Sequence, residues 1–84
     1  MTRSFSKFQE RLRTTGLFGR VESRTLNHHV SLQDLYEGRH TASVVAARRE
    51  VYSWLIREGK SVSEVADLFD RERAGIRKML GRAR

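Results

Sequence analysis

Apolar residues recur three and four positions apart along most of this chain, which is the spacing of one face of an α-helix. The clearest case runs from about 41 to 58, and its apolar stripe consists of Val44, Ala47, Val51, Trp54 and Leu55. Gly59 follows, at the position where a residue in the left-handed conformation commonly ends a helix. The pattern therefore predicts a long helix at the centre of the core.

Shorter stretches before it differ in how clearly they show this period. A helix from about 4 to 13 is predicted by the apolar residues Phe5, Phe8 and Leu12. Ser31, with Asp34 three residues later, has the form of a capping box and starts a short helix that ends near Gly38. Residues 14–30 contain two glycines and no sustained period, so we expect a loop or a partly ordered arm there.

Two short helices with a tight turn follow the long helix. Ser61 and Glu64 form a second capping box, and the apolar residues after it are Val62, Val65, Ala66, Leu68 and Phe69. The pattern breaks after Phe69 and resumes at Ile76, Met79 and Leu80. This is the spacing of a helix-turn-helix, in which a small residue, here Ala66, lets the second helix cross the first closely. Asp70 stands where the turn usually has Gly, and Asp tolerates the left-handed region better than most residues.

No segment alternates in the manner of a strand, so the predicted class is all-α: a small helical bundle of four to five helices with a helix-turn-helix. The 84 residues suffice for one small core, and without cysteine the stability must come from helix packing. No apolar run has the length of a membrane span, and the start of the chain interleaves charges where a signal peptide needs apolar residues. We therefore expect a soluble, cytoplasmic protein with no membrane contact.

The order of these segments resembles a known family. A short SLQDL helix, a loop with a basic residue, a long helix containing AARREVYSWL and the helix pair follow one another between about residues 30 and 82. In this order the chain is similar to the C-terminal DNA-binding domain of the DnaA family of bacterial replication initiators. The resemblance implies a bacterial or phage DNA-binding protein with a DnaA-like domain at 30–84. It does not extend to 1–29, where the residues themselves predict an N-terminal helix and a flexible arm. The family's Asp-His-Thr signature is replaced here by Glu72-Arg73-Ala74-Gly75, so we expect a different target site.

The charge distribution supports a nucleic-acid partner independently. Lys and Arg number 17 against 10 Asp and Glu, a net charge of +7, and a polyanion is the natural partner of such a chain. Residues 71–84 carry six basic residues and one acidic residue, whereas residues 61–70 carry three acidic residues and no basic one. We therefore expect the second helix of the pair to lie in the major groove of double-stranded DNA.

This hypothesis names the DNA-binding residues. Arg73, Gly75 and Arg77 would face base edges, with Gly75 permitting a close approach. Contacts to the phosphates, which fix the register on the duplex, would come from Arg71, Lys78, Arg82, Lys60 and Arg48. Ser61 would add a backbone contact at a helix start, and Arg39 would contribute from the loop.

Other kinds of site find little support in the residues. His28, His29 and His40 lack the spacing of metal ligands. Gly59-Lys60-Ser61 resembles the end of a phosphate-binding loop, but that motif needs Gly where Trp54 stands. No nucleophile with a base and no carboxylate pair stands out, so we expect no enzyme, metal or cofactor.

Two functions remain open from the sequence. The first is sequence-specific binding of double-stranded DNA, in a small transcriptional regulator or a replication-associated factor. The second is a protein-protein interaction module, an adaptor or inhibitor, that uses the apolar residues of 1–29, namely Phe5, Phe8, Leu12, Leu17 and Phe18. The same arm could form a homodimer, because one helix-turn-helix contacts a single half-site.

Overall fold

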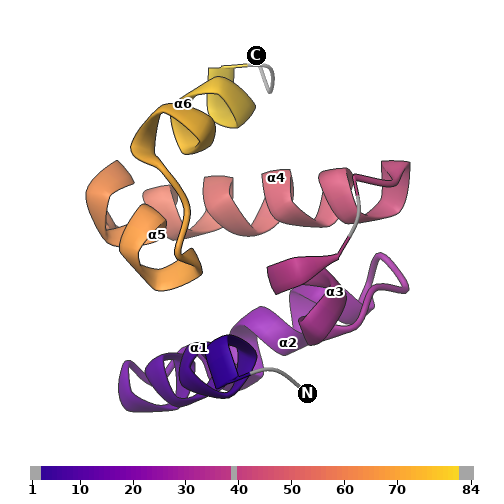
Figure 1. The fold of residues 1–84 in the computed structure, drawn as a ribbon. Coiled ribbons are helices and arrows are strands. Elements are labelled where there is room, and N and C mark those ends of the chain that lie inside the picture. Colours follow the sequence, from indigo (N-terminus) through magenta and orange to yellow (C-terminus); the bar gives the residue numbers. More distant parts are fainter. Residues whose placement is uncertain (1–2, 39, 82–84) are drawn as a thin grey trace.

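The computed structural model describes residues 3–38 and 40–81, and in that part the chain forms helices and no strand. The helices, labelled in Figure 1, are α1 (Arg3–Thr14), α2 (Phe18–Leu26), α3 (Leu32–Glu37), α4 (Ala42–Arg57), α5 (Val62–Phe69) and α6 (Arg73–Gly81). The all-α class is therefore confirmed. The described part contains six helices, one more than the upper limit of the predicted four to five.

The helix that the sequence predicted most clearly is the central one. α4 begins after Thr41, whose side chain accepts a hydrogen bond from the backbone N–H of Val44. It ends before Gly59, which has a φ of +99° and so takes the left-handed conformation that the sequence suggested. Figure 1 shows α4 between α6 and the lower layer of α1 to α3. Because α2, α3, α5 and α6 all pack against it, α4 organises the core.

The segment 14–30 differs from the expected loop or arm, because it contains α2. Leu17, the residue before α2, and Val21 and Thr25 within it are spaced by four residues and are all buried. Because one of these three residues is polar, the segment has too few apolar positions for the sequence to show a helical period. The Thr25 hydroxyl donates to the backbone oxygen of Val21 at 2.7 Å, so its burial leaves no unpaired donor.

Five apolar side chains of 1–29 that the sequence suggested for an exposed contact arm lie in or against the core, which corrects that expectation. Phe5, Phe8, Leu12 and Leu17 are buried, and Phe18 is partly buried against the same core. The Phe8 ring stacks on Tyr36 with a centroid distance of 4.6 Å and meets Phe69 at 5.0 Å. Helix α1 therefore packs on α3 and α5 as part of one hydrophobic core.

Helices α5 and α6 pack against each other and against α4 at the other end of the chain. Val65, Ala66 and Phe69 of α5 are buried together with Ile76 of α6. Asp70 in the turn has φ +54° and ψ +44°, the left-handed conformation predicted for it. Over residues 3–38 and 40–81, no helix combines the length and the apolar composition that a membrane span requires.

Candidate nucleic-acid interface

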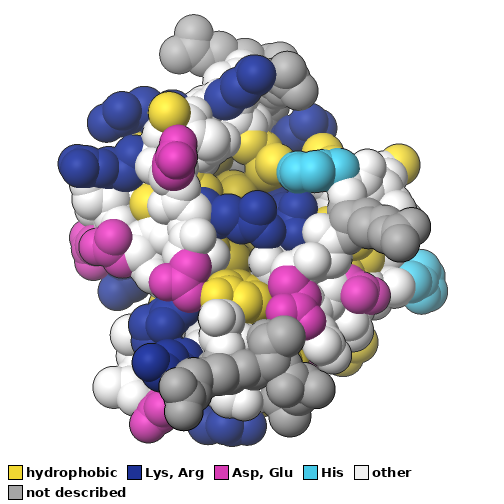
Figure 2. Space-filling model, viewed as in Figure 1, with side chains coloured by type: hydrophobic (Ala, Val, Ile, Leu, Met, Phe, Trp, Pro, Cys, Tyr) yellow, Lys and Arg dark blue, Asp and Glu magenta, His cyan; other side chains and the backbone are white. Residues whose placement is uncertain are grey.

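Helix α6 presents its basic side chains to solvent. Arg73, Arg77 and Lys78 are exposed, while Ile76 is the buried residue that anchors the helix to the core. Figure 2 shows Lys and Arg side chains gathered around the position of α6 at the top of this view. The structure therefore brings three of the predicted DNA-binding residues together on one solvent-facing helix.

Gly75 lies on the same exposed helix, and no neighbour requires a glycine there. A Cβ atom built on Gly75 would meet nothing within 4 Å. The missing side chain therefore leaves open space outside the helix and has no role in packing. This placement is consistent with the prediction that Gly75 lets another molecule approach the backbone.

The start of α5 holds two further predicted residues, Lys60 and Ser61. The Ser61 hydroxyl accepts from the Glu64 N–H at 3.1 Å, and the Glu64 carboxylate accepts from the Ser61 N–H at 3.1 Å. This is a complete capping box, and the hydrogen bond from the Ser61 backbone lowers the pKa of Glu64. The N–H of Ser61 is therefore occupied by Glu64, while Lys60 is half-buried beside it.

Glu64 and Asp67 are exposed on α5, so the contrast in charge between α5 and α6 appears on the surface. A side-chain hydrogen bond also joins the two helices, since Arg73 Nη1 donates to Ser63 Oγ at 3.3 Å. None of the described ion pairs joins a basic side chain of α6 to an acidic residue of α5.

The turn between α5 and α6 is held by a network that the sequence did not reveal. Asp70 Oδ2 accepts from Tyr36 Oη at 2.5 Å and from Arg11 Nη2 at 2.7 Å. Arg11 Nη2 also donates to the Leu68 carbonyl at 3.0 Å. Burial alone would raise the pKa of Asp70, but the hydrogen bonds from Tyr36 and Arg11 outweigh it and lower the pKa. The turn is thereby tied to α1 and α3.

Arg48 is not placed for the surface contact that the sequence suggested. Its side chain is 1% exposed, and Nε donates to the Leu35 carbonyl at 2.8 Å while Nη2 donates to the Gly38 carbonyl at 3.0 Å. These carbonyls belong to the C-terminal end of α3, where a cation is favoured. Arg48 therefore stabilises the end of α3, and we correct the expectation of an exposed phosphate contact.

Arg71 is exposed, as expected, but one of its nitrogen atoms is engaged. Its Nη2 donates to the Tyr36 carbonyl at 2.7 Å, close to the α3 end that Arg48 holds. Burial lowers the pKa of the Arg48 guanidinium, and the neighbouring charge of Arg71 lowers it further. The two predicted residues Arg39 and Arg82 lie outside the described residues.

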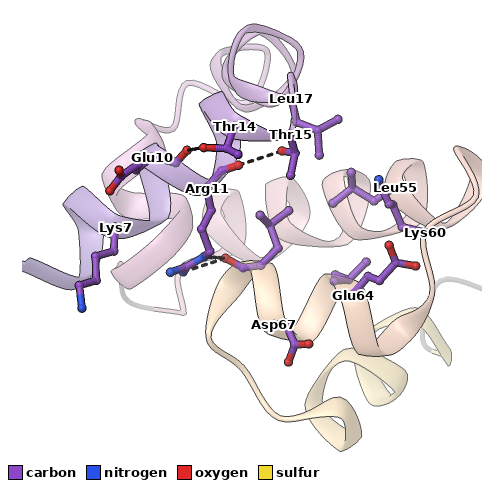
Figure 3. A pocket seen from close by; sticks show the side chains of 12 residues that line it. Lys7, Glu10, Arg11, Thr14, Thr15, Leu17, Leu55, Lys60, Glu64 and Asp67 are labelled. Carbon is purple, nitrogen blue, oxygen red and sulfur yellow. Dashed lines mark hydrogen bonds between the residues drawn. The ribbon is translucent and has the colours of Figure 1, made fainter.

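A groove between α1 and α5 is a second surface feature that the sequence did not predict. It has a volume of about 590 Å³, and its apolar lining includes Leu17, Leu55, Val65 and Leu68. Figure 3 shows Lys7, Glu10 and Arg11 on the α1 side and Glu64 and Asp67 on the α5 side. The lining residues come from segments about 50 residues apart in the chain, so no local sequence pattern could predict the groove.

In the described part of the chain no group of three or more His, Cys, Asp or Glu residues could hold a metal ion. Comparison with known proteins gave no match to this chain among protein families, curated protein sequences or solved structures. The functional argument therefore depends on the geometry and charge of the molecule itself.

Proposed function

We propose that the protein binds double-stranded DNA sequence-specifically through a helix-turn-helix formed by α5, the turn at 70–72 and α6. The observation that carries the proposal is the exposure of Arg73, Arg77 and Lys78 on a helix that only Ile76 anchors deeply in the core. A helix presented in this way can enter the major groove, which is about as wide as a helix with its side chains.

The positions of the basic residues on α6 suggest a division of work. Arg73 and Arg77 are four residues apart and therefore lie on the same side of the helix. From there each can form paired hydrogen bonds with guanine, the commonest specific contact in the major groove. Lys78 projects about 100° further round the helix, where a phosphate of the groove wall is a better partner than a base.

The resemblance to the DnaA family of replication initiators supports the same proposal. It concerns the order of the helices, from the short SLQDL helix to the basic last helix, and it favours a small transcriptional regulator or replication-associated factor. We do not extend it to the initiator's target site, because Glu72-Arg73-Ala74-Gly75 replaces the family's signature.

A salt series tests the proposal directly. Affinity for duplex DNA, measured by fluorescence anisotropy at several salt concentrations, should fall with a log-log slope of about −0.9 for each phosphate neutralised, so about 4 to 6 contacts give a steep line. Selection of bound sequences from random duplexes should return one motif. Absence of salt-dependent binding would overturn the proposal, and strong binding without a motif would replace regulation by an architectural role.

The groove between α1 and α5 favours a second candidate, a protein-protein interaction module. Its apolar floor between charged rims suits an amphipathic helix from a partner, which would place its apolar residues against Leu68 and Val65. Leu68→Glu should then abolish partner binding in a pull-down while Arg77→Gln leaves it intact.

Sedimentation equilibrium of the protein alone tests the further prediction of a homodimer.

A further inference from the structure

A second cavity lies beside the proposed DNA-reading helix, between α4 and the beginning of α6. It has a volume of about 390 Å³ and is lined by His40, Arg48, Tyr52, Arg71, Gly75 and Met79, with Asp70, Glu72 and Ile76 completing the wall. In Figure 2, Lys and Arg side chains gather near the middle of this face with a His close by. The cavity is thus bounded by groups that favour an anion and by apolar side chains.

The strongest indication that the cavity binds an anion is the pattern of hydrogen bonds made by the buried Arg48 guanidinium. Its Nε and Nη2 atoms both donate to α3 carbonyls, and these two atoms form one edge of the planar guanidinium. Nη1 is on the other edge, where it is buried and has no hydrogen-bond partner. The described hydrogen bonds of Arg48 all end on backbone carbonyls, so no described carboxylate compensates its charge. A buried charge without a counterion is costly, and an external anion would relieve that cost.

The other groups around the cavity add to this tendency. Arg71 is exposed and lines the cavity beside Arg48, so two guanidinium groups of like charge lie near each other. Gly75 also lines it and belongs to the first turn of α6, whose leading N–H groups lack partners within the helix.

Two carboxylates at the rim would repel an anion, but one of them already forms an ion pair with another residue. Asp70 Oδ2 already accepts hydrogen bonds from Arg11 and Tyr36 and forms an ion pair with Arg11. Glu72 is exposed at the mouth, where solvent screens its charge. The positive charges of Arg48 and Arg71 therefore dominate the interior of the cavity.

We propose that this cavity binds the phosphate group of a phosphate ester, with Arg71 as the direct donor and Arg48 as the buried charge behind it. An ester is favoured over free phosphate because Met79 and Ile76 give the cavity an apolar wall beside the cationic one. The ester comes either from a DNA backbone, which would deepen the proposed function, or from a free nucleotide. The site itself requires only the protein, so its test does not depend on DNA binding.

The test is a titration of the isotopically labelled full chain with adenosine monophosphate, followed by ¹H–¹⁵N NMR that includes the arginine side-chain signals. We expect saturable shifts at Arg48 Nε, Arg71 and Gly75, and at least a fivefold weaker affinity in Arg71→Gln. Arg77→Gln also removes one positive charge, at a residue of α6 that does not line the cavity. It should change the affinity for adenosine monophosphate less than twofold. His40→Ala removes an exposed side chain that lines the cavity, and it should also weaken the affinity. It is the second variant in case Arg71→Gln fails to fold.

Two results would overturn the site. The first is shifts that do not saturate or that spread over the basic residues of α1 and α2. The second is equal affinity in Arg71→Gln and Arg77→Gln when both variants are folded.

Further arms of the experiment distinguish the source of the ester. If the cavity holds a DNA phosphate, adenosine monophosphate competes with a duplex, and Arg71→Gln reduces the salt slope by about 1. If it holds a free nucleotide, Arg71→Gln weakens nucleotide binding, and adenosine monophosphate does not compete with the duplex. Should the protein bind no DNA at all, saturable nucleotide binding still supports the site, and only the proposed function fails.

Discussion

Asp70 illustrates how one side chain serves both the local turn and the tertiary structure. Its backbone takes the left-handed conformation that ends α5, and its carboxylate accepts from Tyr36 and Arg11. The conformation could be predicted from the sequence, because Asp reaches this region more readily than most residues. The two partners could not, because they are 34 and 59 residues away along the chain.

Replacement of this carboxylate should change how stability depends on pH. The folded pKa of Asp70 lies below its ordinary value of 3.8, so its ionised form stabilises the fold above about pH 4 and that contribution is lost as the pH falls through the folded pKa. Asp70→Asn keeps the left-handed preference and should lower the free energy of unfolding at pH 7 by up to about 1 kcal/mol. Urea unfolding should show this difference shrinking below about pH 4.

The matched control for this variant is Asp67→Asn, which removes an exposed carboxylate from the last turn of α5, just before Asp70. It should leave the free energy of unfolding within about 0.5 kcal/mol of the original protein. A difference between Asp70→Asn and the original protein that stays constant from pH 7 to pH 2 would show that the Asp70 charge is not involved.

The two kinds of contact proposed for α6 should separate in single-residue variants. Arg73→Ala should lose about 1–3 kcal/mol of discrimination at one base pair, because a paired contact to a base is removed. Lys78→Ala should weaken binding to all sequences alike and reduce the salt slope by about 1. Competition titrations against single-base variants of the selected site, repeated at several salt concentrations, measure both effects. Equal loss on all sequences in Arg73→Ala would place that residue at a phosphate.

At the scale of the element, the success of prediction depended on whether the signal was local. The start of α5 was visible because its capping box occupies four consecutive residues, and α4 because its stripe contains five apolar positions. Helix α2 was missed because Thr25 is one of its few inward residues. The sequence places Arg48 at the surface because nothing near it along the chain shows that carbonyls at the end of α3 accept from its Nε and Nη2 atoms.

Helix α6 allows a test in which stability and binding should move in opposite directions. Gly75→Ala adds a Cβ into open space within a helix and should raise the free energy of unfolding by about 0.5–1 kcal/mol. If the backbone of α6 approaches DNA closely, the same methyl group should reduce affinity. Gly19→Ala in α2 is the control, because its Cβ also meets nothing within 4 Å and lies on another helix. Unchanged affinity in Gly75→Ala would exclude a close approach at this position.

At the scale of the whole molecule, the first two helices and the last two belong to one core. Phe8 of α1 touches Tyr36 of α3 and Phe69 of α5, and Arg11 reaches the turn before α6. The sequence allowed the N-terminal residues to be an independent arm, because the other helices already supplied enough apolar positions for a core. The tertiary structure uses both sets, so a change in α1 is expected to act on the helices proposed to bind DNA.

Truncation of Phe8 measures this dependence. Phe8 is fully buried, so Phe8→Ala should reduce the free energy of unfolding by about 3–5 kcal/mol, a large part of the roughly 5–15 kcal/mol typical of a folded protein. Phe18→Ala, at a partly buried position, should cost less. Urea unfolding followed by circular dichroism should show one cooperative transition that moves to lower urea concentration in Phe8→Ala. A loss confined to about 1 kcal/mol, or a separate early transition for α1 and α2, would show that these helices form an independent unit, and DNA binding would then be expected to persist without them.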